Sequence, residues 1–178
     1  MLYLFGLDPS IEHTGWAVVK VDGEMKPVLC GSGVAKQKLD KRDGRYGCIY
    51  MDLMRYVSRI LPSPFPSSST RLAVVEKPHY ERNSKRGKAA AKNKSLIKLS
   101  IAAGACISSV CELGFPYAFV TANQWKREID KGLIRSRVEE YFPRKKGLWA
   151  REDEWEAIAL CLWGKKHQDK LTIHKHHL

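Results

Sequence analysis

The stretch LFGLDPSIEHTGWAVV, residues 4–19, holds two apolar runs joined by a polar turn. The first run is typical of a short buried strand and ends on Asp8, and the second resumes after Gly15. A lone carboxylate at the end of a buried strand has two interpretations. Either Asp8 caps the turn that follows it, or a cation lies opposite its side chain.

The composition favours one globular domain with an anionic partner. A chain of 178 residues suits a single domain over 1–178, of which 167–178 form a basic C-terminal tail. Apolar residues make up 44% of the chain, which argues against disorder. The formal net charge of +12 favours a polyanion, either nucleic acid or an anionic membrane surface.

The lack of recognisable targeting signals and the scattered cysteines predict a cytoplasmic location. No apolar stretch approaches the roughly 20 residues of a membrane span, and the N-terminal MLYLFGL lacks the basic leader of a signal peptide. The five cysteines are scattered without the spacing of a zinc site, so we expect small buried side chains in a reducing compartment.

Five strands are expected along the chain. Their ranges are 2–7, 15–21, 27–35, 71–76 and 117–120. Asp22-Gly23 is a strong hairpin signal, so the first three strands form an antiparallel meander. The later strands alternate with helices, which predicts a mixed five-stranded α/β sheet flanked by helices, with parallel strands after the meander.

Helical periodicity predicts an amphipathic helix over 44–61, a helix over 95–113 that is apolar nearly all round, and a final helix over 152–166. Gly104 in the second of these would allow close backbone contact. The capping-box patterns TANQ (121–124) and SRVE (136–139) predict two further helix starts, and Pro143 ends the second. The segment 62–70 is a loop.

Four acids could share one site. Asp8 and Glu76 both end apolar strands, and ligands of open α/β sheets bind at the carboxyl ends of the strands. Asp153 and Glu156 are three positions apart and therefore share one face of the last helix. Such acids would repel one another unless a divalent cation compensates them. Mg²⁺ prefers these hard oxygen ligands, and two ions per site could cut a phosphodiester.

Each acid also has a simpler interpretation. Asp8 could cap the turn before Ser10, and Glu76 could be a solvated strand end. Asp153 and Glu156 could be an exposed pair that favours the helix dipole. Spacing alone does not decide between these interpretations.

Four segments, in this order, resemble the RuvC-type Holliday junction resolvases of the RNase H-like nuclease superfamily. They are LFGLDPSIEHTGWAVV (4–19), LAVVEKPHYERN (72–83), TANQWKREI (121–129) and DEWEAIAL (153–160). That family has an aspartate at the end of its first strand, a glutamate at the end of a later strand, and a D-x-x-D-A segment in its last helix. The resemblance covers roughly residues 2–163 and suggests a divergent member of the family. Its expected location is the cytoplasm of a bacterial or phage-infected cell.

The resemblance implies an RNase H-like fold, a homodimer and a Mg²⁺-dependent nuclease, for which Mn²⁺ is expected to substitute. Carried over by motif, the catalytic and metal-binding carboxylates fall on Asp8, Glu76, Asp153 and Glu156. Glu156 departs from the family, which has aspartate there, and Glu152 is held in reserve for Asp153. Lys126 matches a family position that contacts DNA or supports the metal site. Its alternative is an ordinary exposed lysine.

A basic run follows Glu76 and is the expected DNA-binding segment. Over 82–98 it carries seven basic side chains and no acid: Arg82, Lys85, Arg86, Lys88, Lys92, Lys94 and Lys98. Phosphate contacts from such a run give salt-dependent affinity. Tyr80 could stack on an unpaired base, although packing explains it equally well. The run could also be a solvated face; it lacks the interleaved apolar residues of a membrane-surface segment.

The favoured function is resolution of four-way DNA junctions by paired symmetric nicks. A related nuclease acting on other branched DNA or on RNA–DNA hybrids is the first alternative, and a non-cleaving junction-binding protein is the second. Two symmetric nicks require two identical sites, which a twofold homodimer supplies. Tyr46, Ile49 and Tyr50 form an apolar stripe that could serve the dimer interface or the core.

Overall fold

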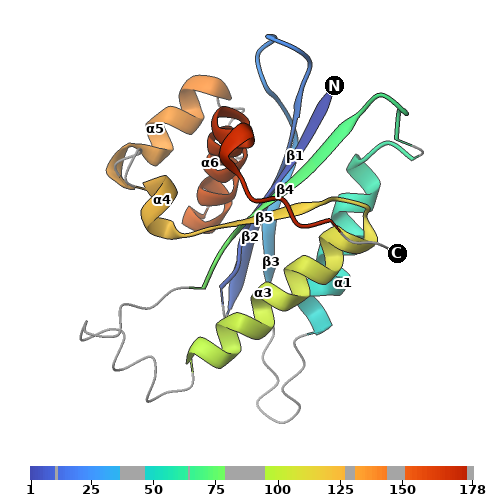
Figure 1. Cartoon of the computed structure of the whole chain (residues 1–178). Coiled ribbons are helices and arrows are strands. Elements are labelled where there is room, and N and C mark those ends of the chain that lie inside the picture. The colour runs from blue at the N-terminus through green and yellow to red at the C-terminus, as the bar shows by residue number, and fades with distance from the viewer. Residues whose placement is uncertain are drawn as a thin grey trace.

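The computed structural model describes residues 1–10, 12–36, 47–63, 65–78, 95–126, 131–143 and 151–175. Five strands form one mixed sheet in the order β3-β2-β1-β4-β5 (Figure 1). The strands are β1 (Leu2–Asp8), β2 (His13–Val21), β3 (Val28–Lys36), β4 (Thr70–Glu76) and β5 (Tyr117–Val120). The predicted number of strands and the predicted sheet type are therefore confirmed.

Strand β1 is the centre of the sheet. It pairs antiparallel with β2, where Asp8 lies opposite Gly15, and parallel with β4, where Leu7 lies opposite Val75. Apolar residues on both faces explain this position, since a central strand is covered on both sides. The turn after β2 is the expected hairpin, in which the Met25 N–H donates to the Asp22 carbonyl at 3.0 Å.

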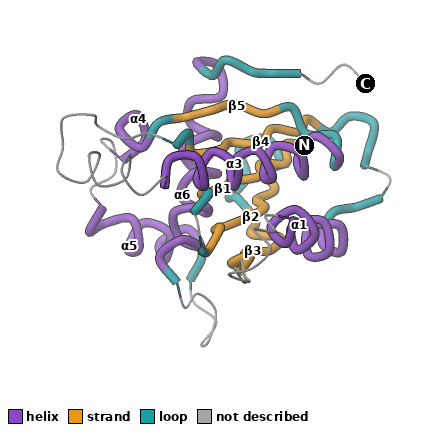
Figure 2. Tube along the Cα trace, turned by 90° about the horizontal axis from the view of Figure 1, so that it is seen from below, coloured by secondary structure: helices purple, strands orange, loops and turns teal. Residues whose placement is uncertain are grey.

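Helices cover both faces of the sheet. They are α1 (Gly47–Ile60), α3 (Ser95–Glu112), α4 (Ala122–Lys126), α5 (Lys131–Tyr141) and α6 (Glu152–His167). Helix α6 packs over β1 and β2 on one face with α5 outside it, while α1 and α3 lie on the other face (Figure 2). Among the described residues, no helix is long and apolar enough to cross a membrane.

One of the two predicted capping boxes is real. At the start of α4, the Thr121 N–H donates to Gln124 Oε1 at 2.7 Å, and the Gln124 N–H donates to Thr121 Oγ1 at 3.3 Å. The predicted start at Ser136 is wrong, because α5 begins at Lys131 and Ser136 lies inside it. Its hydroxyl donates to the Leu133 carbonyl three residues back, so the side chain bonds within the helix instead of capping it.

Helix α3 is less buried than its composition suggests. Leu96, Ile97 and Ile101 are exposed near its N-terminal end. Gly104 makes no close contact either, since a β-carbon there would have open space around it. The close approaches lie instead at Gly6 of β1 and Gly15 of β2. A β-carbon on Gly6 would collide with the Ala157 carbonyl oxygen, and one on Gly15 with the Asp153 carbonyl oxygen.

These two glycines let α6 lie directly on the sheet, and this generates a stability prediction. Gly6→Ala should lower the free energy of unfolding by roughly 1–3 kcal/mol, because the backbone of α6 must move away. A loss of about 1 kcal/mol lowers Tm by roughly 2–4 °C in a domain of this size, so the change is measurable by thermal unfolding.

Gly104→Ala is the matched control. It adds the same methyl group in open space within a helix, where alanine is favoured over glycine by about 0.5–1 kcal/mol. Tm should therefore stay level or rise in this variant. If both variants lose the same Tm, the close approach of α6 to β1 is not the reason that glycine is needed at position 6.

Candidate metal centre

Sheet topology brings Asp8 and Glu76 together although 67 residues lie between them in the chain. Strands β1 and β4 are parallel neighbours in register, so both acids lie at the carboxyl ends of adjacent strands. Helix α6 crosses the same end of the sheet and adds Glu156. One carboxylate oxygen from each of Asp8, Glu76 and Glu156 lies within 4.8 Å of the others.

The close approach of α6 sets the distance from Glu156 to the strands. The backbone at Asp153 rests on Gly15, and the backbone at Ala157 rests on Gly6. Glu156 lies between these two contacts along the helix. Its carboxylate is buried although it belongs to a predominantly polar segment of the sequence. The interpretation of Glu156 as an exposed helix acid is therefore wrong.

Within the described residues, Asp8 is not the side chain that caps the turn after β1. The hydroxyl of Ser10 does so, by donating to the His13 carbonyl at 2.5 Å and accepting from the His13 N–H at 2.9 Å. Asp8 itself is only 7% exposed. Burial raises the pKa of its carboxyl well above the ordinary value; the Glu76 and Glu156 carboxylates raise this pKa further, against a smaller opposite effect of Lys126.

Lys126 supplies positive charge to the acids. Its Nζ donates to Glu156 Oε2 at 2.7 Å and lies 3.4 Å from Glu76 Oε2. Burial alone would lower the pKa of this ammonium, but Glu76, Glu156 and Asp8 together raise it above the ordinary value. The interpretation of Lys126 as an ordinary exposed lysine is therefore wrong. Among the described residues, the Lys126 ammonium faces all three carboxylates, so these four groups together carry excess negative charge when all are ionised.

Glu76 is held by a second donor that the sequence did not indicate. The indole Nε1–H of Trp125 donates to Glu76 Oε2 at 2.8 Å. Burial raises the pKa of the Glu76 carboxyl, whereas Lys126 and this indole bond lower it. Trp125 lies in the TANQWK segment, directly before Lys126. A solvated strand end would not have such a partner.

Asp153 lies apart from the three clustered carboxylates. It is half-buried in the first turn of α6, where burial raises its pKa and the nearby His13 lowers it. Glu156 also raises this pKa, so Asp153 lies within the electrostatic field of the cluster. The reserve residue Glu152 is exposed. The assignment of Asp153 as a fourth ligand stays a prediction.

Glu154 is a buried acid that the sequence analysis did not select. It belongs to α6, and the Ser32 hydroxyl of β3 donates to its Oε1 at 2.6 Å. Glu154 therefore fastens the start of α6 to β3.

The expected DNA-binding run lies mostly outside the described residues. This applies to Tyr80, Arg82, Lys85, Arg86, Lys88, Lys92 and Lys94. Lys98 is described and is exposed on α3. The assignment of this run to DNA binding stays a prediction.

The donor set of the cluster fits a divalent cation. All three groups offer carboxylate oxygens, which Mg²⁺ and Mn²⁺ accept and which softer metals prefer less. Burying several carboxylates together is costly unless positive charge compensates them, and Lys126 compensates only part of the charge. A divalent ion would supply the remainder.

Comparison with known proteins gives a likeness of fold. No protein-family model and no curated protein sequence matches the chain. Thermus thermophilus RuvC in complex with a Holliday junction substrate aligns with a TM-score of 0.72 and 22% identity, over 98% of this chain and 99% of that chain. A second Thermus thermophilus RuvC structure aligns at 0.70 and 21% identity, over 96% and 99%. The yeast mitochondrial Holliday junction resolvase Ydc2 aligns at 0.49 and 11% identity, over 94% and 80%.

The two Thermus alignments confirm the RNase H-like fold that the sequence resemblance implies. They extend over nearly the whole of both chains, so the five-stranded mixed sheet with its flanking helices matches the fold of those proteins.

The raised pKa of Asp8 generates a prediction about the metal-free chain. Because the folded-state pKa lies above the unfolded-state value of about 3.9, the Asp8 contribution favours folding at acid pH and is lost as pH rises through the folded-state pKa. At pH 7 with chelator, Asp8→Asn should therefore raise Tm by a few degrees, about what 1 kcal/mol gives in such a domain. The difference should shrink towards pH 4.

Divalent metal should reverse this order. Mg²⁺ at about 100 times its Kd stabilises a folded chain by roughly 2.7 kcal/mol, and only the wild type keeps the full ligand set. Asp22→Asn, in the exposed hairpin turn, is the control and should behave as wild type. An Asp8→Asn chain that is less stable than wild type in chelator, or equally stabilised by Mg²⁺, would contradict the site.

Proposed function

We propose that the chain is a RuvC-type, metal-dependent endonuclease that resolves four-way DNA junctions. One observation carries the proposal: the buried cluster of Asp8, Glu76 and Glu156 lies at the carboxyl ends of adjacent strands. The likeness of fold to RuvC and the net charge of +12 support it. In a strongly basic protein, a buried cluster of three carboxylates is best explained by a bound cation.

Asp8, Glu76 and Glu156 would hold Mg²⁺, or Mn²⁺ in its place, with Asp153 as the expected fourth ligand and two ions per site. When bound, the metal would polarise the phosphodiester and lower the pKa of water. The protein's own share is to keep these carboxylates fixed on rigid elements, two at strand ends and one on a helix packed against the sheet. Such rigid support is what a precise ligand geometry requires.

Lys126 would have two roles in this function. In the metal-free chain it neutralises part of the charge on Glu76 and Glu156. Its side chain is only partly buried, so the ammonium also reaches the surface where a phosphate would approach. A cation there would attract a phosphodiester and favour the extra negative charge of the transition state.

A twofold homodimer would provide the two sites that paired nicks require. Helices α1 and α3 lie side by side on one face of the sheet (Figure 1). Both helices expose large apolar side chains. These are Met51 and Tyr56 on α1 and Leu96, Ile97 and Ile101 on α3. Exposed apolar groups that gather on neighbouring helices are typical of an interface. Of the residues suggested by the sequence, Tyr50 is half-buried, and Tyr46 and the Ile49 side chain lie outside the described residues.

The substrate prediction is tested with labelled four-way junctions, forks, linear duplex and RNA–DNA hybrid, offered side by side with Mg²⁺. Wild type should cut the four-way junction in preference to the others. Asp8→Asn should lose at least about a hundredfold in cleavage rate, since even outer-shell changes cost 10–100-fold. Its DNA binding should persist, because a negative charge facing phosphate is removed.

Asp22→Asn again serves as the control and should cut like wild type. Preferred cutting of forks or hybrid would replace junction resolution by the related-nuclease alternative. Binding of junctions without cutting by wild type would favour the non-cleaving alternative. Full cutting activity in Asp8→Asn would show that the carboxylate cluster takes no part in the cleavage reaction.

The dimer prediction uses an exposed residue of α3. Ile97 is 59% exposed, so Ile97→Glu should leave the fold intact but place a charge in the proposed interface. Sedimentation should then show a monomer, and cruciform DNA should receive single nicks instead of paired ones. Ile173→Glu is the matched control, because Ile173 is also exposed, at 44%, but lies beyond α6. A strictly monomeric wild type would exclude this mode of resolution.

A further inference from the structure

We propose that Trp125 is a positioning residue for the Glu76 carboxylate and keeps it oriented when the divalent cation binds. The inference rests on the proposed function in one respect, since it takes Glu76 to be a metal ligand. It assigns a role to an indole that lies in the TANQWKREI segment but to which the family resemblance gives none.

The geometry places the indole at the base of the centre. Trp125 is completely buried, with 0% of its surface exposed, and its Nε1–H donates to Glu76 Oε2 at 2.8 Å. It reaches Glu76 from the neighbouring strand, because β5 is parallel to β4 with Val120 opposite Glu76, and α4 follows β5 directly. The capping box of Thr121 and Gln124 fixes the start of this short helix.

The indole differs from Lys126 in one property that matters for metal binding. Both groups lie close to Glu76 Oε2. Lys126 is a cation, so its attraction to the Glu76 carboxylate would weaken when a divalent cation binds there. The indole is neutral, donates one hydrogen bond and cannot titrate. Its bond to a carboxylate is therefore compatible with the bound metal. Outer-shell donors of this kind fix the orientation of the ligand that they contact.

The indole ring also contributes to the position of Lys126. The ammonium of Lys126 lies 4.8 Å from the centroid of the Trp125 ring, within the range of a cation–π interaction. The ring would therefore offer the ammonium a favourable position next to the carboxylates when a divalent cation is bound.

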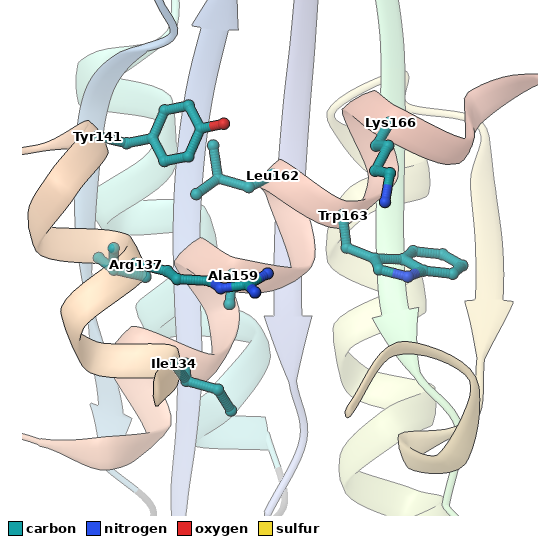
Figure 3. Close-up of a pocket in the computed structure, with 8 residues that line it drawn as sticks. Ile134, Arg137, Tyr141, Ala159, Leu162, Trp163 and Lys166 are labelled. Carbon is teal, nitrogen blue, oxygen red and sulfur yellow. The ribbon is translucent and has the colours of Figure 1, made fainter. Parts of the chain in front are cut away.

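A second tryptophan shows that burial alone does not demand such a bond. Trp163 of α6 is only 8% exposed, and within the described part of the chain its Nε1 has no hydrogen-bond partner. It borders the groove between α5 and α6, beside Ala159 and Lys166 (Figure 3), and it lies seven residues after Glu156 along α6. Trp163→Phe removes a buried indole N–H without removing a hydrogen bond, so it is a matched control for Trp125→Phe.

The test measures Mn²⁺ affinity by calorimetric titration of the full chain in the absence of DNA. Trp125→Phe should bind Mn²⁺ about tenfold more weakly than wild type, the usual loss when an outer-shell donor is removed. Trp163→Phe should bind within about twofold of wild type, since its indole lies outside the centre. Equal Mn²⁺ affinities in the two variants would overturn the proposal.

A second measurement keeps the proposal testable if Trp125→Phe does not fold. In wild type with assigned ¹⁵N indole resonances, the Trp125 Nε1–H should exchange slowly with solvent and shift when Mg²⁺ is added. Fast exchange and no shift would overturn the proposal. Junction cutting by wild type tests the proposed function separately. If wild type leaves junctions uncut while Trp125→Phe weakens Mn²⁺ binding, this inference stands and the proposed function fails.

Discussion

Repulsion among three carboxylates at one end of a buried strand is the constraint on which the rest of this molecule depends. Asp8, Glu76 and Glu156 lie close together, the Glu76 and Glu156 carboxylates raise the pKa of Asp8, and Asp8 is almost completely buried. A chain selected only for stability would place apolar residues there. Lys126 relieves part of the repulsion, and protonation of Asp8 or a divalent cation can relieve the remainder.

The fold meets this constraint with rigid elements and close contacts. Parallel pairing of β1 with β4 fixes two of the acids, and the contacts of α6 at Gly6 and Gly15 bring in the third. Ser32 and Glu154 fasten the same end of α6 to β3. Trp125 and Lys126 approach from α4 and complete the surroundings of Glu76. Each of these contacts joins residues distant in sequence, so the centre can exist only in the folded chain.

The sequence was sufficient for the sheet and for placing Asp8 and Glu76 at one edge of it, whereas the role of the acids as metal ligands stays a prediction. Continuous apolar runs that end on Asp8 and Glu76 indicate central strands, and parallel pairing then places their ends together. The helix start predicted at Ser136 was wrong because a four-residue capping pattern also occurs inside helices, where tertiary packing decides. The burial of Glu154 and the bond from Trp125 could not be foreseen. Both depend on the angle at which α6 and α4 meet the sheet, which periodicity does not encode.

Diffraction from crystals soaked with Mn²⁺, recorded at a wavelength where manganese scatters anomalously, tests the central claim most directly. We expect an anomalous peak bounded by the carboxylates of Asp8, Glu76 and Glu156, with the Lys126 ammonium moved away from Glu156 and the Trp125 indole still bonded to Glu76. The same map would show whether Asp153 turns towards the ion. Saturating Mn²⁺ without a peak at these carboxylates, and with Lys126 still bonded to Glu156, would contradict the account.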